Sequence, residues 1–300
     1  MGVLDSPELK GEKMAKLLVI DKCCFQGASE ARLIEFGGKY QVFLPHALVI
    51  ECLISDDCDG RKPCKNPIYL LHRVEALVKA GAYFGRSSVS IHKEEQKNRR
   101  AVVQFIDEKA TLLIRAGTSV LTEEFVCREA EECRKAFDPL VKLVSDLALV
   151  FVEAIKEKAM SKGFQKEIQE TCTVQRFGRN LQAADQKKDE ILQKWIPSLA
   201  SDVTEDWYTW QLIRLWYAWA IEWAGRRPNT DDTTLQPDLS NDFYDMEYVA
   251  SLSRADAIIT KEGEKKGLVP HLARAAFPEK DVFSSLEEVP KSYRRDWVDR

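Results

Sequence analysis

Short apolar segments near the two ends of this 300-residue chain constrain its fold more than any other feature. Residues 16–20 form an apolar run that ends at Asp21, and residues 40–44 form a second run. Two further short runs, at 256–260 and 282–283, lie near the C-terminus. Segments with helical spacing separate the runs at both ends. Strands that alternate with helices predict an α/β fold with a central parallel sheet.

The middle of the chain has a different pattern. Apolar residues within 123–158 recur at steps of three and four, which predicts a long amphipathic helix. Residues 164–195 continue in the same style, and the tryptophan-rich segment 207–223 predicts a further helix that is apolar almost all round and therefore buried. Its internal Arg214 and Glu222 argue against a membrane span. Because this helical block interrupts the α/β alternation, we interpret it as an insertion.

Several local patterns give more detailed expectations. Residues 29–36 predict a helix that stops at the Gly-Gly pair, and residues 68–84 predict another helix. Residues 87–91 are typical of a short strand. The prolines, asparagine and aspartates of 226–240 indicate a loop before a helix at 244–252.

Carboxylates follow the predicted strands or lie on neighbouring helices. Asp21 follows the first strand and Glu262 follows the late strand, so both belong to the carboxyl edge of the sheet, where α/β proteins bind ligands. Glu51 and Asp245, on adjacent helices, can reach the same edge, and Asp242 is an additional acid near it. Converging carboxylates repel one another unless a cation binds, and oxygen-only ligands suit Mg²⁺ or Mn²⁺. Taken singly, each acid is more typical of a helix cap or a solvated residue, so the prediction depends on their order.

That order resembles the PIN-domain nucleases. The resemblance rests on Leu-Leu-Val-Ile-Asp21, on Phe-Leu-Pro-His-Ala-Leu-Val-Ile-Glu51, on Asn-Asp-Phe-Tyr-Asp245 and on Ala-Ile-Ile-Thr-Lys-Glu262. It implies a three-layer α/β/α fold in which Asp21, Glu51 and Asp245 bind Mg²⁺ or Mn²⁺, and cleavage of single-stranded RNA. We therefore predict a catalytic and metal-binding set that comprises Asp21, Glu51, Asp245 and Glu262, with Asp242 as a further metal ligand.

The resemblance also implies a division of the chain into domains. At two positions, the sequence differs from the family pattern. Residues 14–56 and 236–290 are expected to form one discontinuous PIN-like domain, which the mostly helical insertion 57–235 interrupts, and residues 291–300 are a C-terminal tail. The family usually has Thr-x-Asp after the late strand, whereas this chain has Thr-Lys-Glu262, and a residue that is often small and polar is Cys23 here. Either Glu262 or Asp242 therefore completes the expected metal site.

Composition narrows the functional classes. The net charge is −4, so the chain as a whole is not a basic nucleic-acid coat protein. No Gly-x-Ser-x-Gly elbow or phosphate-binding glycine-rich loop supports other hydrolase or nucleotide chemistry. The polar, charged start without a signal sequence predicts a cytoplasmic protein with mostly reduced thiols. Cys52, Cys58 and Cys64 lack the Cys-x2-Cys pairs that structural zinc sites favour.

The leading prediction is a Mg²⁺- or Mn²⁺-dependent phosphodiesterase acting on single-stranded RNA in preference to DNA, with no membrane association. The basic runs 97–100, 226–227 and 294–295 could form a substrate track, although short charge runs are usually solvated surface. The alternative is a catalytically weak or inactive PIN-like scaffold whose helical insertion binds a protein partner or a second copy of the chain. Rings of the tryptophan-rich helix could stack on bases, although a helix that is apolar almost all round is more typical of the protein core.

Overall fold

The computed structural model describes residues 16–54, 67–118, 173–226, 232–263 and 267–296, together with parts of 121–153. Within these residues, five short strands form one parallel sheet in the order β3-β2-β1-β4-β5. The α/β prediction is therefore confirmed at the level of a parallel sheet among helices. The strands are β1 (Leu17–Ile20), β2 (Gln41–Leu44), β3 (Tyr83–Phe84), β4 (Ala257–Ile259) and β5 (Asp281–Phe283).

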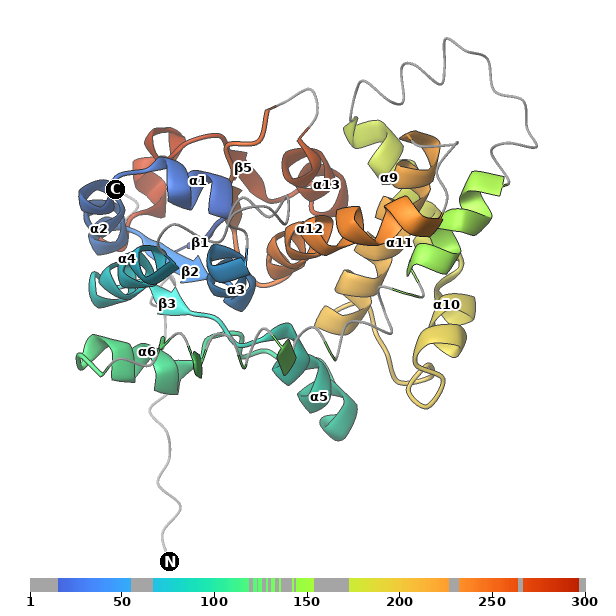
Figure 1. Cartoon of the computed structure of the whole chain (residues 1–300), viewed down its shortest axis with the longest axis horizontal. Coiled ribbons are helices and arrows are strands. Elements are labelled where there is room, and N and C mark those ends of the chain that lie inside the picture. The colour runs from blue at the N-terminus through green and yellow to red at the C-terminus, as the bar shows by residue number, and fades with distance from the viewer. Residues whose placement is uncertain are drawn as a thin grey trace, which may run out of the picture.

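The helices account for most of the described chain (Figure 1). Some described residues between 121 and 153 are also helical. The named helices are α1 (Lys22–Gly27), α2 (Glu30–Lys39), α3 (His46–Ile54), α4 (Pro67–Lys79), α5 (Ser88–Asn98), α6 (Glu108–Arg115), α9 (Val174–Gln186), α10 (Lys188–Trp195), α11 (Tyr208–Arg226), α12 (Asp232–Ser251) and α13 (Leu268–Ala276), followed by 3₁₀ turns at Leu286–Glu288 and Lys291–Tyr293.

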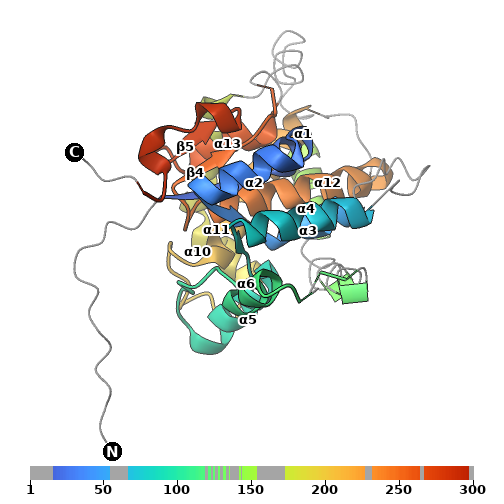
Figure 2. The same ribbon diagram turned by 90° about the vertical axis from the view of Figure 1, so that its left-hand side faces the viewer.

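The direction in which the sheet is wound reverses at β1. From β1 the chain moves outward through β2 to β3, and from β4 it moves in the opposite direction to β5. Right-handed crossovers then put the helices of the two halves on opposite faces of the sheet. In agreement, α2, α3 and α4 lie side by side (Figure 2), whereas α12 packs on α13. The reversal makes the carboxyl ends of β1 and β4 a topological switch point, the usual place for a ligand.

Strand β1 occupies the middle of the sheet because its apolar side chains suit a position with neighbours on every side. Leu18, Val19 and Ile20 are fully buried, and Leu18 aligns with Val42 on one side and Ala257 on the other. The carboxylate of Asp256 accepts a hydrogen bond from the Leu17 backbone N–H at 2.8 Å and so ties the start of β1 to β4.

The tryptophan-rich helix α11 is a core helix, as its sequence predicts. Trp210 and Trp216 are fully buried, and α11 packs on α9 and on α12. Figure 1 shows α9, α10 and α11 to one side of the sheet. Helix α13 also packs on α9, which joins the helical block to the sheet. No helix among the described residues is both long and apolar enough to cross a membrane.

Two local predictions are wrong because capping and packing outweigh simple patterns. Residues 88–91 belong to helix α5 rather than to a strand, since the Ser87 hydroxyl caps the helix by accepting from the Ser90 N–H at 3.2 Å. Helix α2 does not stop at its glycines but continues to Lys39. A Cβ on Gly37 would lie 2.5 Å from Leu77 Cδ1, so this glycine allows close helix packing rather than a helix end.

Two other boundaries differ from the sequence-based prediction. Helix α12 begins at Asp232, within the predicted loop 226–240, and continues without a break to Ser251. The segment 68–84 is not a single helix: α4 ends at Lys79, Gly81 turns the chain with a φ of 124°, and Tyr83–Phe84 forms β3. Strand β3 pairs with β2, so this part of the predicted insertion 57–235 joins the sheet.

Candidate functional site

Asp21 lies at the switch point, immediately after β1. Its backbone N–H donates to the Ile259 carbonyl at 3.1 Å, and its side chain caps α1 by accepting from the Cys24 N–H at 2.8 Å. The Asp21 side chain also has a hydrogen bond with Thr260. Burial raises the pKa of Asp21 to about 7, and the charges of Glu262 and Glu51 contribute to the rise, while both hydrogen bonds oppose it.

Glu51 approaches the same edge from α3. One carboxylate oxygen accepts from Lys22 Nζ at 3.1 Å, and the other accepts from the Tyr248 hydroxyl at 2.7 Å. Burial raises the pKa of Glu51, and Lys22 opposes this effect. Glu51 is therefore an acid whose charge already has a cationic partner.

Asp245 is the acid with the least compensation. It is half-buried on α12, and within the described parts of the chain it has no hydrogen-bond donor and no cationic partner. Burial raises the pKa of Asp245 well above its ordinary value, and the neighbouring charges of Glu262 and Asp242 add to the rise. Asp242, one helical turn earlier, accepts a hydrogen bond from Trp219 Nε1 at 2.8 Å.

The side chain of Glu262 is long enough to reach from the end of β4 to the start of α13. Its carboxylate accepts from the Val269 N–H at 2.8 Å at the start of α13, where Gly267 offers no side-chain cap. The Glu262 backbone N–H donates to Thr260 Oγ1 at 3.2 Å. Burial raises the pKa of Glu262, and Asp242 and Glu51 raise it further. Glutamate in place of the expected aspartate thus spans from the strand end to the next helix.

A cavity of about 270 Å³ joins three of the five predicted acids. Asp242, Asp245 and Glu262 are among its lining residues. The same cavity is lined by Trp219, Glu222, Trp223 and Arg226 of α11, and by Leu268. Asp21 and Glu51 are not among the lining residues, but their charges act on Asp245. The acids therefore form one electrostatically linked cluster.

The donor chemistry suits a hard divalent cation, although the side chains are held by other partners. In the described part of the chain, no three His, Cys, Asp or Glu side chains are arranged to hold a metal ion. Glu51 is bound by Lys22 and Tyr248, and Glu262 by the start of α13. Carboxylate oxygens are the ligands that Mg²⁺ and Mn²⁺ prefer, so binding would require these side chains to exchange partners.

Sequence reasoning missed the contribution of α11 to this site. Glu222 is buried and accepts two hydrogen bonds from Arg176, at 3.1 Å from Nε and 2.5 Å from Nη2. Arg226 Nε also donates to Glu222, at 3.1 Å. The four-residue spacing of Glu222 and Arg226 was a helical ion-pair signal in the sequence. Arg176 lies 46 residues from Glu222, and no local pattern indicates that pairing.

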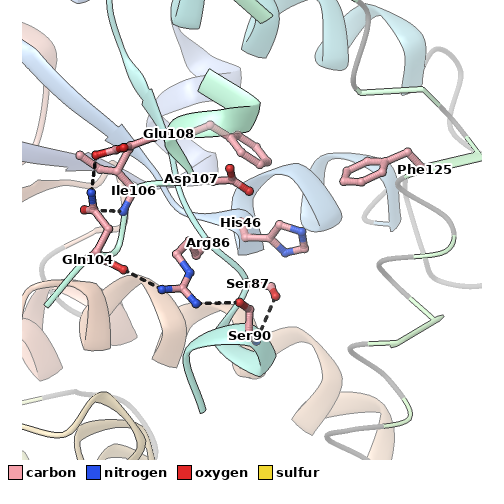
Figure 3. A pocket seen from close by; sticks show the side chains of 10 residues that line it. His46, Arg86, Ser87, Ser90, Gln104, Ile106, Asp107, Glu108 and Phe125 are labelled. Carbon is pink, nitrogen blue, oxygen red and sulfur yellow. Dashed lines mark hydrogen bonds between the residues drawn. The ribbon is translucent and has the colours of Figure 1, made fainter. Parts of the chain in front are cut away.

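A second cavity, of about 400 Å³, lies beyond the carboxyl ends of β2 and β3 (Figure 3). Its polar side chains mainly hold neighbouring elements together. Arg86 donates to Ser90 Oγ at 3.0 Å and to the Gln104 carbonyl at 3.2 Å, as Figure 3 shows. Asp107 caps α6 through the Ala110 N–H at 2.9 Å. The two acids that line this cavity, Asp107 and Glu108, each accept a hydrogen bond, from the Ala110 N–H and from Gln104 Nε2, unlike Asp245 in the first cavity.

The two cysteines whose side chains the structure describes, Cys23 and Cys24, give no support to a zinc site. Cys23 is exposed as a residue, but its thiol is partly desolvated beside the acid cluster, and this desolvation together with the charge of Asp21 raises the pKa of the thiol to about 12. A thiol with so high a pKa stays protonated at neutral pH, which disfavours metal binding through sulfur. The side chains of Cys52, Cys58 and Cys64 lie outside the described residues.

Known proteins give no further guide to the site. No family model, no curated protein and no solved structure matches this chain. Its function has to be inferred from the acids, the cavity and the sheet edge at which they lie.

Proposed function

We propose that the chain is a Mg²⁺- or Mn²⁺-dependent nuclease of the PIN type, which hydrolyses single-stranded RNA in preference to DNA. One observation carries the proposal. Asp245, without a donor or a cation among the described residues, shares a cavity with Asp242 and Glu262 at the edge of the sheet. The order of the acids along the chain, which resembles the PIN-domain nucleases, supports the same assignment.

A bound divalent cation would remove the repulsion within the cluster. Asp21, Asp245 and either Glu262 or Asp242 are the residues that would hold it, and Glu51 would join them if Lys22 were displaced. When bound, the ion supplies a lower pKa for a water molecule and neutralises charge on the phosphoryl group.

The chain's own side chains prepare this site. The Cys24 N–H and Thr260 fix the orientation of the Asp21 carboxylate. Trp219 fixes Asp242, and the Val269 N–H fixes Glu262. The buried walls, with Trp219 and Trp223 almost fully inaccessible, limit the water around the acids and so strengthen each charge interaction.

Metal-dependent cleavage of labelled oligonucleotides tests the proposal. Wild-type protein should cleave single-stranded RNA faster than DNA in Mn²⁺ or Mg²⁺, and EDTA should stop the reaction. Asp245→Asn should lose about 100-fold or more of the activity, because loss of a group that only supports a metal ligand commonly costs about 10- to 100-fold, and loss of a ligand should cost at least as much. Asp185→Asn, a half-exposed acid paired with Arg214 away from the cavity, is the matched control and should retain activity.

A non-catalytic scaffold is the competing proposal. It is favoured by Lys22, whose ammonium already takes a cation's place on Glu51 at 3.1 Å. A scaffold of this kind should gain no thermal stability from Mn²⁺, whereas a nuclease should gain several degrees at a saturating concentration. Folded wild-type protein that neither cleaves nor gains stability with Mn²⁺ would support the scaffold.

A further inference from the structure

We propose that Lys22 acts as a built-in cation of the acid cluster and takes the place of a second metal ion, so that the site binds one divalent ion. This inference rests on the nuclease proposed above. Enzymes that cleave phosphodiesters with two metal ions hold the ions about 3.5–4 Å apart. Lys22 begins α1 directly after Asp21, and its Nζ lies 3.1 Å from Glu51 Oε1. The ammonium therefore already occupies a carboxylate oxygen that a second ion would need.

The position of Lys22 follows from the way in which α1 begins. Asp21 comes immediately after β1, and its side chain caps α1 by accepting from the Cys24 N–H at 2.8 Å. Helix α1 therefore begins at the carboxyl edge of the sheet, and Lys22 is its first residue. Glu51 reaches the same edge from α3, which follows β2. The ion pair of Lys22 and Glu51 thus belongs to the switch point.

Both oxygens of Glu51 already have a hydrogen-bond donor. Oε1 accepts from Lys22, and Oε2 accepts from the Tyr248 hydroxyl at 2.7 Å. The side chains of Lys22 and Glu51 are only 18% and 14% exposed, so water screens the pair only in part. A metal ion that bound Glu51 would have to displace Lys22 or lie beside its ammonium. The first change leaves a partly buried cation without its partner, and the second brings two positive charges together.

Asp245 offers a metal ion the opposite surroundings. Within the described chain it has neither a donor nor a cationic partner, and it lines the cavity together with Asp242 and Glu262. Glu51 is not among the residues that line this cavity. A divalent ion at Asp245 would meet an acid without a cation of its own, whereas an ion at Glu51 would meet an ammonium. This difference favours a single ion on the cavity side of the cluster.

A purely structural ion pair accounts for less of this arrangement. The charge of Glu51 raises the pKa of Asp21, of Asp245 and of Glu262. A cation on Glu51 therefore lowers the repulsion across the whole cluster, as a metal ion would, instead of compensating one acid alone. Removing that cation should change how many ions the cluster binds, which the loss of a local surface pair would not do.

Counting bound Mn²⁺ by equilibrium dialysis tests this role of Lys22. Wild-type protein should bind one ion per chain at a saturating concentration. Lys22→Met leaves the carboxylate of Glu51 without its ammonium, so this variant should bind a second ion, and its affinity for the first should rise about tenfold. In EDTA the variant should melt at a lower temperature than wild type, because the charge of Glu51 then lacks a cation. Saturating Mn²⁺ should remove that difference.

Two further variants identify the groups involved. Lys22→Met combined with Glu51→Gln removes the acid that would hold the extra ion and should bind one ion again. Lys39→Met is the matched control, because Lys39 forms an exposed pair with Glu35 on α2. Helix α2 ends directly before β2 begins, so Lys39 lies at the amino edge of the parallel sheet, opposite the acids. This control should bind one ion with wild-type affinity.

The results distinguish failure of this inference from failure of the nuclease proposal. Two ions on wild type, or one ion on both wild type and Lys22→Met, would overturn the role of Lys22 and leave the nuclease intact. If Lys22→Met does not fold, Lys22→Gln takes its place with the same expectations. If wild type binds no Mn²⁺, the nuclease proposal fails. An ion that Lys22→Met then binds and the double variant loses would retain Lys22 as the built-in cation, and no binding in either variant would end both proposals.

Discussion

Buried carboxylates occur in two regions of this protein, and the two regions treat them differently. In the helical region, Glu95 of α5 is fully buried and accepts hydrogen bonds from the Tyr208 N–H at 2.8 Å, the Thr209 N–H at 3.0 Å and Thr209 Oγ1 at 2.6 Å. Glu222 has two arginine partners. At the sheet edge, Asp245 has neither a donor nor a cation among the described residues, and its neighbours are other acids.

This difference in compensation distinguishes buried acids with a structural role from a buried acid whose surroundings favour a bound cation. A buried charge costs several kcal/mol unless hydrogen bonds or an opposite charge compensate for it. Glu95 meets this requirement by capping the start of α11, where unpaired N–H groups favour an anion. Asp245 does not meet it within the described chain, and its neighbours are other acids, which is the physical reason for placing a cation there.

The largest effect on stability is expected when a fully hydrogen-bonded acid of the helical region is removed. Glu95→Ala removes the acceptor for the Tyr208 and Thr209 N–H groups and should lower the free energy of unfolding by about 3–5 kcal/mol, as loss of a buried charged partner does. Denaturant unfolding followed by circular dichroism measures it. Glu94→Ala, at a more exposed acid on the same helix, should cost less than about 1 kcal/mol. Equal effects of the two variants would contradict a structural role for Glu95.

Removing the charge of an acid at the sheet edge should change the free energy of unfolding in the opposite direction. The pKa of Asp21 is about 7 in the folded protein, whereas its ordinary value in an unfolded chain is 3.8, so the folded state favours the protonated acid. Its stabilising contribution is complete below pH 3.8 and is lost as the pH rises through 7. In EDTA at pH 8, Asp21→Asn should therefore raise the free energy of unfolding by about 1–3 kcal/mol.

Metal and pH provide the controls for Asp21→Asn. At pH 5 the gain should be smaller, because the folded wild type is then mostly protonated at this site. Saturating Mn²⁺ should reverse the order by stabilising wild type more than the variant, since the ion binds the folded carboxylate cluster. A variant that is less stable than wild type in EDTA at pH 8 would show that the Asp21 charge is compensated after all.

A smaller effect is expected from the contact that links the two regions. Trp219→Phe removes the indole N–H that donates to Asp242 at 2.8 Å, and it should weaken Mn²⁺ affinity about tenfold, the usual effect of losing a hydrogen bond to a ligand. Trp216→Phe is the matched control, because Trp216 Nε1 has no hydrogen-bond partner among the described residues. Titration calorimetry measures both affinities. If the two variants bind Mn²⁺ equally, Trp219 serves packing and Asp242 is not a ligand.

The sequence predicted the parts of this site that depend on local order. Asp21 follows a buried apolar strand, and Glu262 follows another, so their position at the sheet edge could be derived from strand direction alone. Strand β3 is two residues long and exists because it pairs with β2, which no local pattern reveals. The Arg176–Glu222 pair depends in the same way on how α9 packs against α11. Long-range packing therefore decides which residues complete the cavity.

The smallest expected effect is a pH dependence of stability in the helical region around Glu95. His92 Nδ1 lies 2.8 Å from Thr209 Oγ1, and Gln96 Nε2 lies 2.9 Å from His92 Nε2. Because the Thr209 hydroxyl donates to Glu95, it accepts from Nδ1–H, and the Gln96 amide donates to Nε2. The network therefore requires a neutral imidazole, in agreement with burial, which lowers the pKa of His92.

Stability linked to His92 should change in the direction opposite to that of Asp21. It is fully present above pH 6.5, the ordinary pKa of a histidine, and decreases as the pH falls below that value, because the unfolded chain then binds a proton that the folded chain resists. The difference in unfolding free energy between His92→Gln and wild type should shift by about 0.5–1 kcal/mol in favour of the variant between pH 7.5 and pH 5.5. Parallel denaturant titrations at the two pH values measure that shift. If the difference in unfolding free energy is the same at both pH values, the folded protein accepts a charged His92. The hydrogen bonds around Glu95 would then not require a neutral imidazole.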